Sequence, residues 1–141
     1  MPLRTVLGFT IFLALVACGN TPSLPQKPQL ITDRDSLGFG QEFGSGTYIG
    51  TSTQNSLMIE NQGLDPLVLN QVTIAGDSAF VLDPASSTTI KAKARAFLRI
   101  TFTPTQAKVY TATITIDSNA ENTPHKTVDV TGKGIVGGDG G

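Results

Sequence analysis

An alternation of apolar and polar residues with a period of two runs through most of the sequence, from Leu37 to Gly134. This period is typical of β-strands that bury one face, and no stretch of the region shows the 3.6-residue period of an amphipathic helix. The segments 96–103 (AFLRITFT) and 109–116 (VYTATITI) follow the alternation most closely. The pattern therefore restricts the chain to an all-β fold.

Turn residues divide the alternating region into short strands. Asn61-Gln62-Gly63 predicts a turn, and Pro104 ends a strand because proline cannot donate to the ladder. The first strand is expected near Leu37–Phe43. The last strand, around Val128 and Val130, is expected to end at Gly132-Lys133-Gly134.

A change of phase between Leu69 and Val72 predicts a β-bulge or bend near Asn70-Gln71. With this bend, the region contains about seven short strands separated by turns, which is the pattern of an antiparallel β-sandwich. Two facing sheets of this size can bury enough apolar surface to fold without a disulfide. We therefore predict one domain, a single β-sandwich.

Composition excludes several classes of function. A formal net charge of −1 argues against a nucleic-acid partner, which requires a clustered basic surface. One cysteine excludes an intrachain disulfide and a multi-cysteine metal site, and one histidine leaves few groups for acid–base catalysis near neutral pH. We therefore predict no catalytic residues, no metal, no cofactor and no small-molecule substrate.

Residues 1–17 have the features of a secretory signal peptide. Arg4 supplies a positive charge, and residues 6–16 (VLGFTIFLALV) form an apolar run that is too short to span a bilayer as a helix, which needs roughly 20 residues. A buried N-terminal helix is the alternative, but no cap or amphipathic pattern accompanies the run.

The end of this segment, Leu15-Val16-Ala17-Cys18, resembles the lipobox of bacterial lipoproteins. The resemblance implies cleavage between Ala17 and Cys18, with lipid chains such as diacylglyceryl and palmitate on Cys18. It implies a membrane partner through this lipid and a place in the bacterial cell envelope. Because Gly19 and not aspartate follows the cysteine, the outer membrane or cell surface is favoured in an organism with two membranes.

Residues 18–35 are predicted to be a flexible tether that follows the lipid. Pro22, Pro25 and Pro28 recur at every third residue, which favours an extended polyproline-like chain. Such a chain holds a folded domain clear of the lipid surface. A proline-rich ligand for another domain is the alternative. At the other end, residues 135–141 are rich in glycine and are predicted to be disordered.

The region 36–134 carries a second resemblance, to the immunoglobulin-like (Ig-like) domains of the abnormal-spindle/hydin (ASH) type, as found in choice-of-anchor D proteins and related to major sperm protein. It rests on the order of short motifs: Ser36-Leu37-Gly38-Phe39-Gly40, Asn61-x-Gly63, Asp65-Pro66-Leu67, Ile100-Thr101-Phe102-Thr103-Pro104, Tyr110-x-Ala112-x-Ile114-x-Ile116, Pro124 and Val128-x-Val130-x-Gly132-x-Gly134. Lys91–Arg95 departs from the family, which usually has a Pro/Gly/Ser-rich turn there. The resemblance implies a non-catalytic module that binds proteins or provides structural support.

Three motifs that could carry chemistry have simpler interpretations. Asp33-x-Asp35 resembles the start of a calcium loop, but Leu37 and Gly44 occupy later ligand positions. We expect these aspartates to close turns on their own backbone. The glycine-rich segment 44–50 lacks the spacing of a nucleotide-binding loop and is expected to be a flexible loop. His125 is expected in a solvated turn, with no nucleophile or carboxylate predicted beside it.

Lys91, Lys93, Arg95 and Arg99 form the one local charge bias. Alternation places them on one side of a strand together with Phe97, opposite the core. The simpler interpretation is a turn and a strand face exposed to solvent. The functional interpretation is contact with anionic lipid headgroups or with an acidic partner. Phe97 either anchors a protein contact or is covered by the N-terminal segment, and we favour the second.

The sequence thus predicts a non-catalytic, lipid-anchored envelope protein whose Ig-like domain binds a protein of unknown identity or provides structural support. The alternative is a module that binds carbohydrate or peptidoglycan. It ranks lower because two tyrosines and no tryptophan leave few aromatic platforms on which a sugar could stack.

Overall fold

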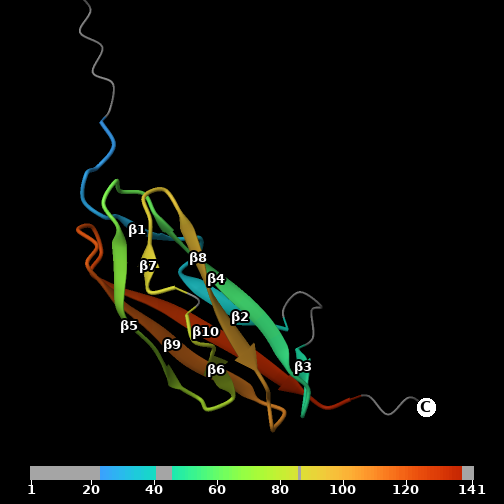
Figure 1. The fold of residues 1–141 in the computed structure, drawn as a ribbon. Helices are drawn as coiled ribbons and strands as arrows, with labels where there is room; N and C mark the ends of the chain where they lie inside the picture. Colours follow the sequence, from blue (N-terminus) through green and yellow to red (C-terminus); the bar gives the residue numbers. More distant parts are fainter. Residues whose placement is uncertain (1–22, 41–45, 86, 138–141) are drawn as a thin grey trace, which may run out of the picture.

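The computed structural model describes residues 23–40, 46–85 and 87–137. These residues form ten β-strands and no helix, and the strands make two sheets packed face to face (Figure 1). The predicted all-β, Ig-like sandwich is confirmed. The cleavage and lipidation positions Ala17 and Cys18, and the rest of the predicted signal peptide, lie outside the described residues.

The smaller sheet has four antiparallel strands. Two long strands, β4 (Thr53–Asn61) and β8 (Arg95–Phe102), pair with each other at its centre. The short strands β1 (Leu30–Thr32) and β6 (Phe80–Leu82) flank them, in the order β1-β4-β8-β6.

The larger sheet has six strands. Three long strands, β10 (His125–Ile135), β9 (Val109–Ser118) and β5 (Leu67–Gly76), are antiparallel neighbours. The short strand β7 (Thr89–Ile90) pairs with β5. Two more short strands, β2 (Ser36–Phe39) and β3 (Thr47–Tyr48), pair with β10 in the parallel direction.

The number of strands and their directions differ in detail from the prediction. Ten strands are present where about seven were expected, because several have only two or three residues, too few for an alternation to be detected. The sandwich is not purely antiparallel, since β2 and β3 run parallel to β10. Direction depends on the path of the loops, which alternation does not record.

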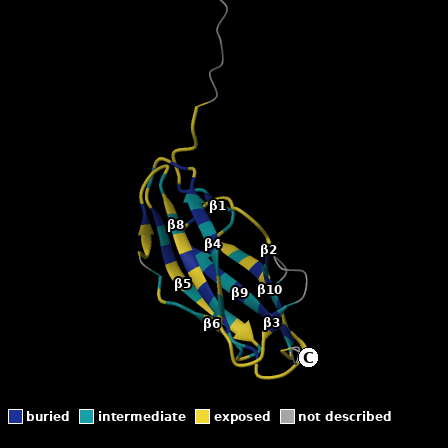
Figure 2. Cartoon of the chain, turned by 90° about the vertical axis from the view of Figure 1, so that its right-hand side faces the viewer, coloured by how far each residue is buried: buried dark blue, intermediate teal, exposed yellow. Residues whose placement is uncertain are grey.

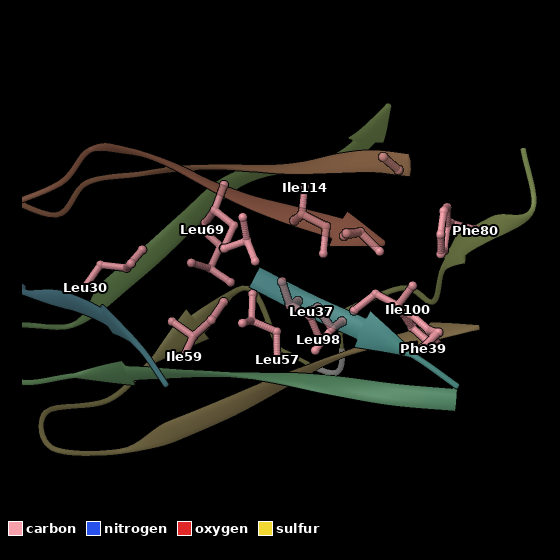
Figure 3. Packing of buried hydrophobic residues seen from close by; sticks show 14 of the residues in the cluster. Leu30, Leu37, Phe39, Leu57, Ile59, Leu69, Phe80, Leu98, Ile100 and Ile114 are labelled. Atoms are coloured by element: carbon pink, nitrogen blue, oxygen red, sulfur yellow. The ribbon is translucent and has the colours of Figure 1, made fainter. Parts of the chain in front are cut away.

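The core lies between the two sheets and is formed by the apolar residues of the alternating pattern (Figure 3). Along β8, buried and more exposed residues alternate as predicted (Figure 2). At one end the rings of Phe39, Phe80 and Phe102 pack with centroids 4.7 to 5.6 Å apart, and Tyr110 meets Phe102 edge-on. This aromatic cluster joins both sheets, and at this size such clusters contribute strongly to stability.

The predicted bulge is confirmed. The pairing of β5 with β9 shifts register between Leu69 and Gln71, so Asn70 is left over. Before the shift β5 pairs also with β7; after it, no described strand pairs with that side of β5.

The predicted end of the last strand at Gly132-Lys133-Gly134 is wrong, because β10 continues through both glycines to Ile135. The glycines are needed for close approach and not for a turn. A Cβ on Gly132 would lie 2.7 Å from the Phe102 ring, and one on Gly134 would lie 2.1 Å from the carbonyl oxygen of Gln106. Because β10 includes Ile135, the domain extends past the predicted boundary at 134; the end of the predicted tail, 138–141, lies outside the described residues.

The predicted tether also needs correction, because from Pro25 onward the chain is bound to the domain. Backbone N–H groups of Leu64 and Asp65 donate to the carbonyls of Pro25 and Gln26, at 3.1 and 2.8 Å. Leu30 then enters the core as part of β1. The proline spacing predicts an extended chain, but it does not predict whether that chain is solvated or docked.

Candidate binding surface

The outer face of the four-stranded sheet carries the predicted contact residues of β8. Arg95, Phe97 and Arg99 alternate with the buried residues of β8, so all three side chains point away from the core. The register with β4 places Arg95 opposite Glu60, Phe97 opposite Met58 and Arg99 opposite Ser56. The sequence placed these three residues on one side correctly.

Lys91 and Lys93 lie in the turn before β8 and not on the strand, which corrects the predicted alternation from 91 onward. Lys93 has a φ of 59°, in the left-handed region, so the backbone turns there and the period of two cannot continue. Its ammonium group donates to the carbonyl oxygen of Gln62 in the neighbouring turn. The strand therefore begins at Arg95, with both lysines in the turn that precedes it.

The arginines of β8 differ in their environment. The Arg95 guanidinium donates to the carboxylate of Glu60 across the sheet at 2.7 Å. This hydrogen bond, with the positive charge of Arg95, holds the pKa of Glu60 below its ordinary value of 4.5. Across the parts of the chain that the structure describes, the Arg99 guanidinium has no such partner. Arg99 is thus the cation of this face that is available to an external anion.

Phe97 is 57% exposed, although we expected the N-terminal segment to cover it. The described part of that segment instead pairs along the opposite edge of β4, where Ile31 lies opposite Glu60. Phe97 therefore lies exposed between Arg95 and Arg99, with Met58 as its cross-strand neighbour. We call Arg95, Phe97, Arg99 and Met58 the β8 face. The sequence did not indicate Met58, because only the register brings it beside Phe97.

The predicted roles of Asp33 and Asp35 are wrong in detail. The Asp33 carboxylate accepts a hydrogen bond from the Met58 N–H at 3.0 Å, on β4 and not on its own turn. Asp35 pairs with Lys126 at 2.5 Å. Within the described residues no group of His, Cys, Asp and Glu side chains could hold a metal ion.

His125 is the first residue of β10, not part of a turn, and its Nδ1 lies 2.6 Å from Asp117 Oδ1. The sequence did not predict this carboxylate. The pair arises because His125 and Asp117 are opposite each other in the β9–β10 register. Both side chains lie at the surface, which suits a cross-strand hydrogen bond. No helix among the described residues is long and apolar enough to cross a membrane.

Comparison with known proteins places this fold in a family. Residues 28–133 match the model of the HYDIN/CFA65/VesB-like Ig-like domain. The chain belongs to this family. The match begins near β1, in agreement with the docked N-terminal segment. No curated protein matches the sequence.

Solved structures with this Ig-like fold come from diverse proteins. The ASH/PapD-like domain 7 of human CEP192 aligns over 96% of this chain and 99% of that domain, with a TM-score of 0.61 and 15% identity. A protein of unknown function from Porphyromonas gingivalis W83 aligns over 81% of this chain, with a TM-score of 0.64 and 23% identity. The Vibrio cholerae VesB protease aligns over 73% of this chain, with a TM-score of 0.56 and 13% identity.

The Ig-like domain spans only part of two of these proteins: 51% of the Porphyromonas chain and 31% of the VesB protease. At these identities the similarity establishes the fold alone.

Proposed function

We propose that this protein is a non-catalytic, lipid-anchored component of a bacterial cell envelope whose Ig-like domain binds a protein partner through the β8 face. The observation that carries the proposal is the exposed Phe97 beside Arg99, which has no counter-ion within the described residues. Aromatic and arginine side chains contribute most of the binding energy at many protein interfaces. The family match supports a binding or structural module.

The chemistry of the β8 face suits an acidic segment that also carries an apolar side chain. Arg99 offers five N–H donors to a carboxylate, and Phe97 with Met58 offers an apolar contact beside it. A lipid on Cys18 would confine the domain to the membrane surface, so that weak contacts with other surface-bound proteins become effective.

Crosslinking of the full chain in its host membranes tests the binding face. We expect Phe97→Ser/Arg99→Ser to lose a defined protein partner that the wild type captures. Val109→Ser/Lys133→Ser is a matched control, since it removes an exposed apolar side chain and an adjacent cation from the larger sheet. Equal capture by the wild type and the Phe97→Ser/Arg99→Ser variant would refute the role of the β8 face. Recovery of cell wall alone would support the carbohydrate- or peptidoglycan-binding alternative.

A separate experiment tests the lipid anchor. In cells fed a palmitate analogue, we expect the wild type to be labelled and to sediment with membranes. Cys18→Ala should lose the label and become soluble. An unlabelled wild type would remove the anchor from the proposal and leave the β8 face to be judged alone.

A further inference from the structure

The second half of β5 is an open sheet edge. The β7 strand pairs with Leu67 and Val68, and the N–H of Leu69 donates to Thr88. Beyond the bulge at Asn70, no described strand pairs with that side of β5, and β7 lies beside only one end of β5 (Figure 1).

The hydrogen-bonding pattern identifies which backbone groups are free. Asp77 donates its N–H to Thr111 on β9, so by alternation Ala75, Thr73 and Gln71 also face β9. The N–H and C=O groups of Val72, Ile74 and Gly76 therefore point away from the sheet. No described residue hydrogen-bonds them.

The side chains next to this edge indicate a missing neighbour. Val72 and Ile74 point toward the core, yet both are only partly buried because no strand extends beyond them. A groove of about 290 Å³ lies between the start of this edge and the segment that follows β6, and its lining includes Val72, Leu82, Pro84 and Leu98. An added strand would cover apolar surface as well as pair backbone groups.

The open stretch lacks the charged side chains and prolines that commonly prevent pairing. Natural proteins protect open edges with charged side chains, prolines, bulges or very short strands. Residues 67–76 (LVLNQVTIAG) contain no charged residue and no proline, and the bulge lies before the open stretch. The first half of β8, which β6 does not reach, carries Arg95 and Arg99, and these would repel the same arginines of a second copy.

We propose that the open edge of β5 pairs with the same edge of a second copy of this chain. A twofold axis beside Ile74 places Ile74 opposite its counterpart and Val72 opposite Gly76 of the other copy. This register forms on the order of six hydrogen bonds. The open stretch is self-complementary, since about this axis the outward N–H and C=O groups of residues 72, 74 and 76 meet the same groups of the other copy. It is bounded by β7 at one end and by the turn at Asp77 at the other. The contact occupies the open β5 edge of each copy, so no such edge is left for a third copy and the assembly closes as a dimer.

Cysteine crosslinking tests the register in the full chain. Thr73 lies opposite Ala75 of the other copy, as a non-hydrogen-bonded pair. In host membranes we co-express a Thr73→Cys chain and an Ala75→Cys chain with different tags. We expect this pair to crosslink at least about fivefold more than two Thr73→Cys chains, because closely facing cysteines meet disulfide geometry. Thr127→Cys, exposed on β10 of the same sheet, is the control.

Mass measurement of the purified full chain gives an independent result. We expect a dimer for the wild type and a monomer for Thr73→Lys/Ala75→Lys, which gathers four cations about the axis without altering the core face. Mixing with Thr73→Glu/Ala75→Glu should restore dimers. A monomeric wild type, equal crosslinking of all pairs, or crosslinks only to another protein would overturn the proposal. Phe97→Ser/Arg99→Ser should still dimerise, so this proposal and the β8-face proposal fail separately.

Discussion

One end of the sandwich is closed by side chains, whereas the side formed by β5 is open. At the closed end the N-terminal segment, the turn after β4 and the β9–β10 loop meet (Figure 1). Three asparagine side chains hydrogen-bond the loop backbone and the ends of β1 and β5 there. At the open side, regular strand backbone has no described partner. The difference shows that side chains satisfy the backbone hydrogen bonds where chain segments meet at the closed end, whereas the backbone groups along the second half of β5 remain available for pairing.

Asn61 is the centre of the closed end and is fully buried. Its Oδ1 accepts from the N–H groups of Gln29 and Gly63 at 3.2 and 2.9 Å, and its Nδ2 donates to the carbonyls of Asp65 and Ile90 at 2.8 and 3.2 Å. One side-chain amide thus satisfies backbone groups in the N-terminal segment, in the turn after β4 and at the end of β7.

Asn122 and Asn119 make the same kind of contact at the neighbouring loop. The N–H of Leu30 donates to Asn122 Oδ1 and Asn122 Nδ2 donates to the Leu30 carbonyl, both at 2.8 Å. Asn119 Oδ1 accepts from the N–H of Val68 at 2.7 Å. These amides hold β1 and the start of β5 in place.

Among the substitutions that test the closed end, Asn61→Leu should have the largest effect on stability. The change keeps the volume but leaves several buried backbone groups unpaired, and each such group costs about 1–3 kcal/mol. We expect a loss of about 4 kcal/mol in the free energy of unfolding, measured by urea denaturation. The exposed Asn70→Ala is the control; an equal loss for both would mean that the closed end has no special role.

Gly63→Ala should have the next largest effect. A Cβ on Gly63 would lie 2.1 Å from the carbonyl oxygen of Lys27, so the docked N-terminal segment must move. We expect a loss of about 2–3 kcal/mol, as for overpacked sites. Gly50→Ala is a milder comparison because its Cβ meets nothing within 4 Å, although its φ of +77° adds strain. An unchanged Gly63→Ala protein would show that the segment is not docked in solution.

Asn122→Ala tests the contribution of one asparagine that anchors β1. It removes both hydrogen bonds to Leu30, and we expect a loss of about 1–2 kcal/mol. Amide exchange should rise at β1 more than at β8, because β1 has only three residues and few other bonds. Uniform exchange across both strands would contradict local anchoring.

Substitutions on the open side should cost little stability. For Thr73→Lys/Ala75→Lys, measured at concentrations where only monomers are present, we expect a change within about 0.5 kcal/mol. The effect should be small because the side chains of Thr73 and Ala75 are both exposed on the outer face of β5. A loss of unfolding free energy as large as that of Asn122→Ala would mean that the side chains of the open edge contribute to the stability of the fold.

The smallest effect concerns Glu60 and acid. Because the pKa of Glu60 is lowered in the folded state, its contribution is present above about pH 4.5 and is lost as pH falls through the lower folded value. Glu60→Gln should therefore flatten the decline in urea midpoint between pH 5 and pH 3. An identical decline in both proteins would show that the exposed Arg95–Glu60 pair adds nothing to stability.

The sequence predicted the fold class, the bulge at Asn70-Gln71 and the shared side of Arg95, Phe97 and Arg99, because alternation within a strand fixes which face each side chain takes. It did not predict the exposure of Phe97 or the partner of Arg95. Those depend on which strand lies alongside, and local periodicity contains no information on strand order.

The limits of the domain show the same division. The sequence determined that the alternating stretches between residues 37 and 134 form strands, because a period of two can bury one face only in a β-structure. Tertiary structure alone decided that Pro25–Thr32 dock, that β10 passes through Gly132, and that β5 is left open beyond its bulge. Each of these depends on contacts between residues far apart in the chain, where the geometry of two approaching backbones decides what pairs and what stays free.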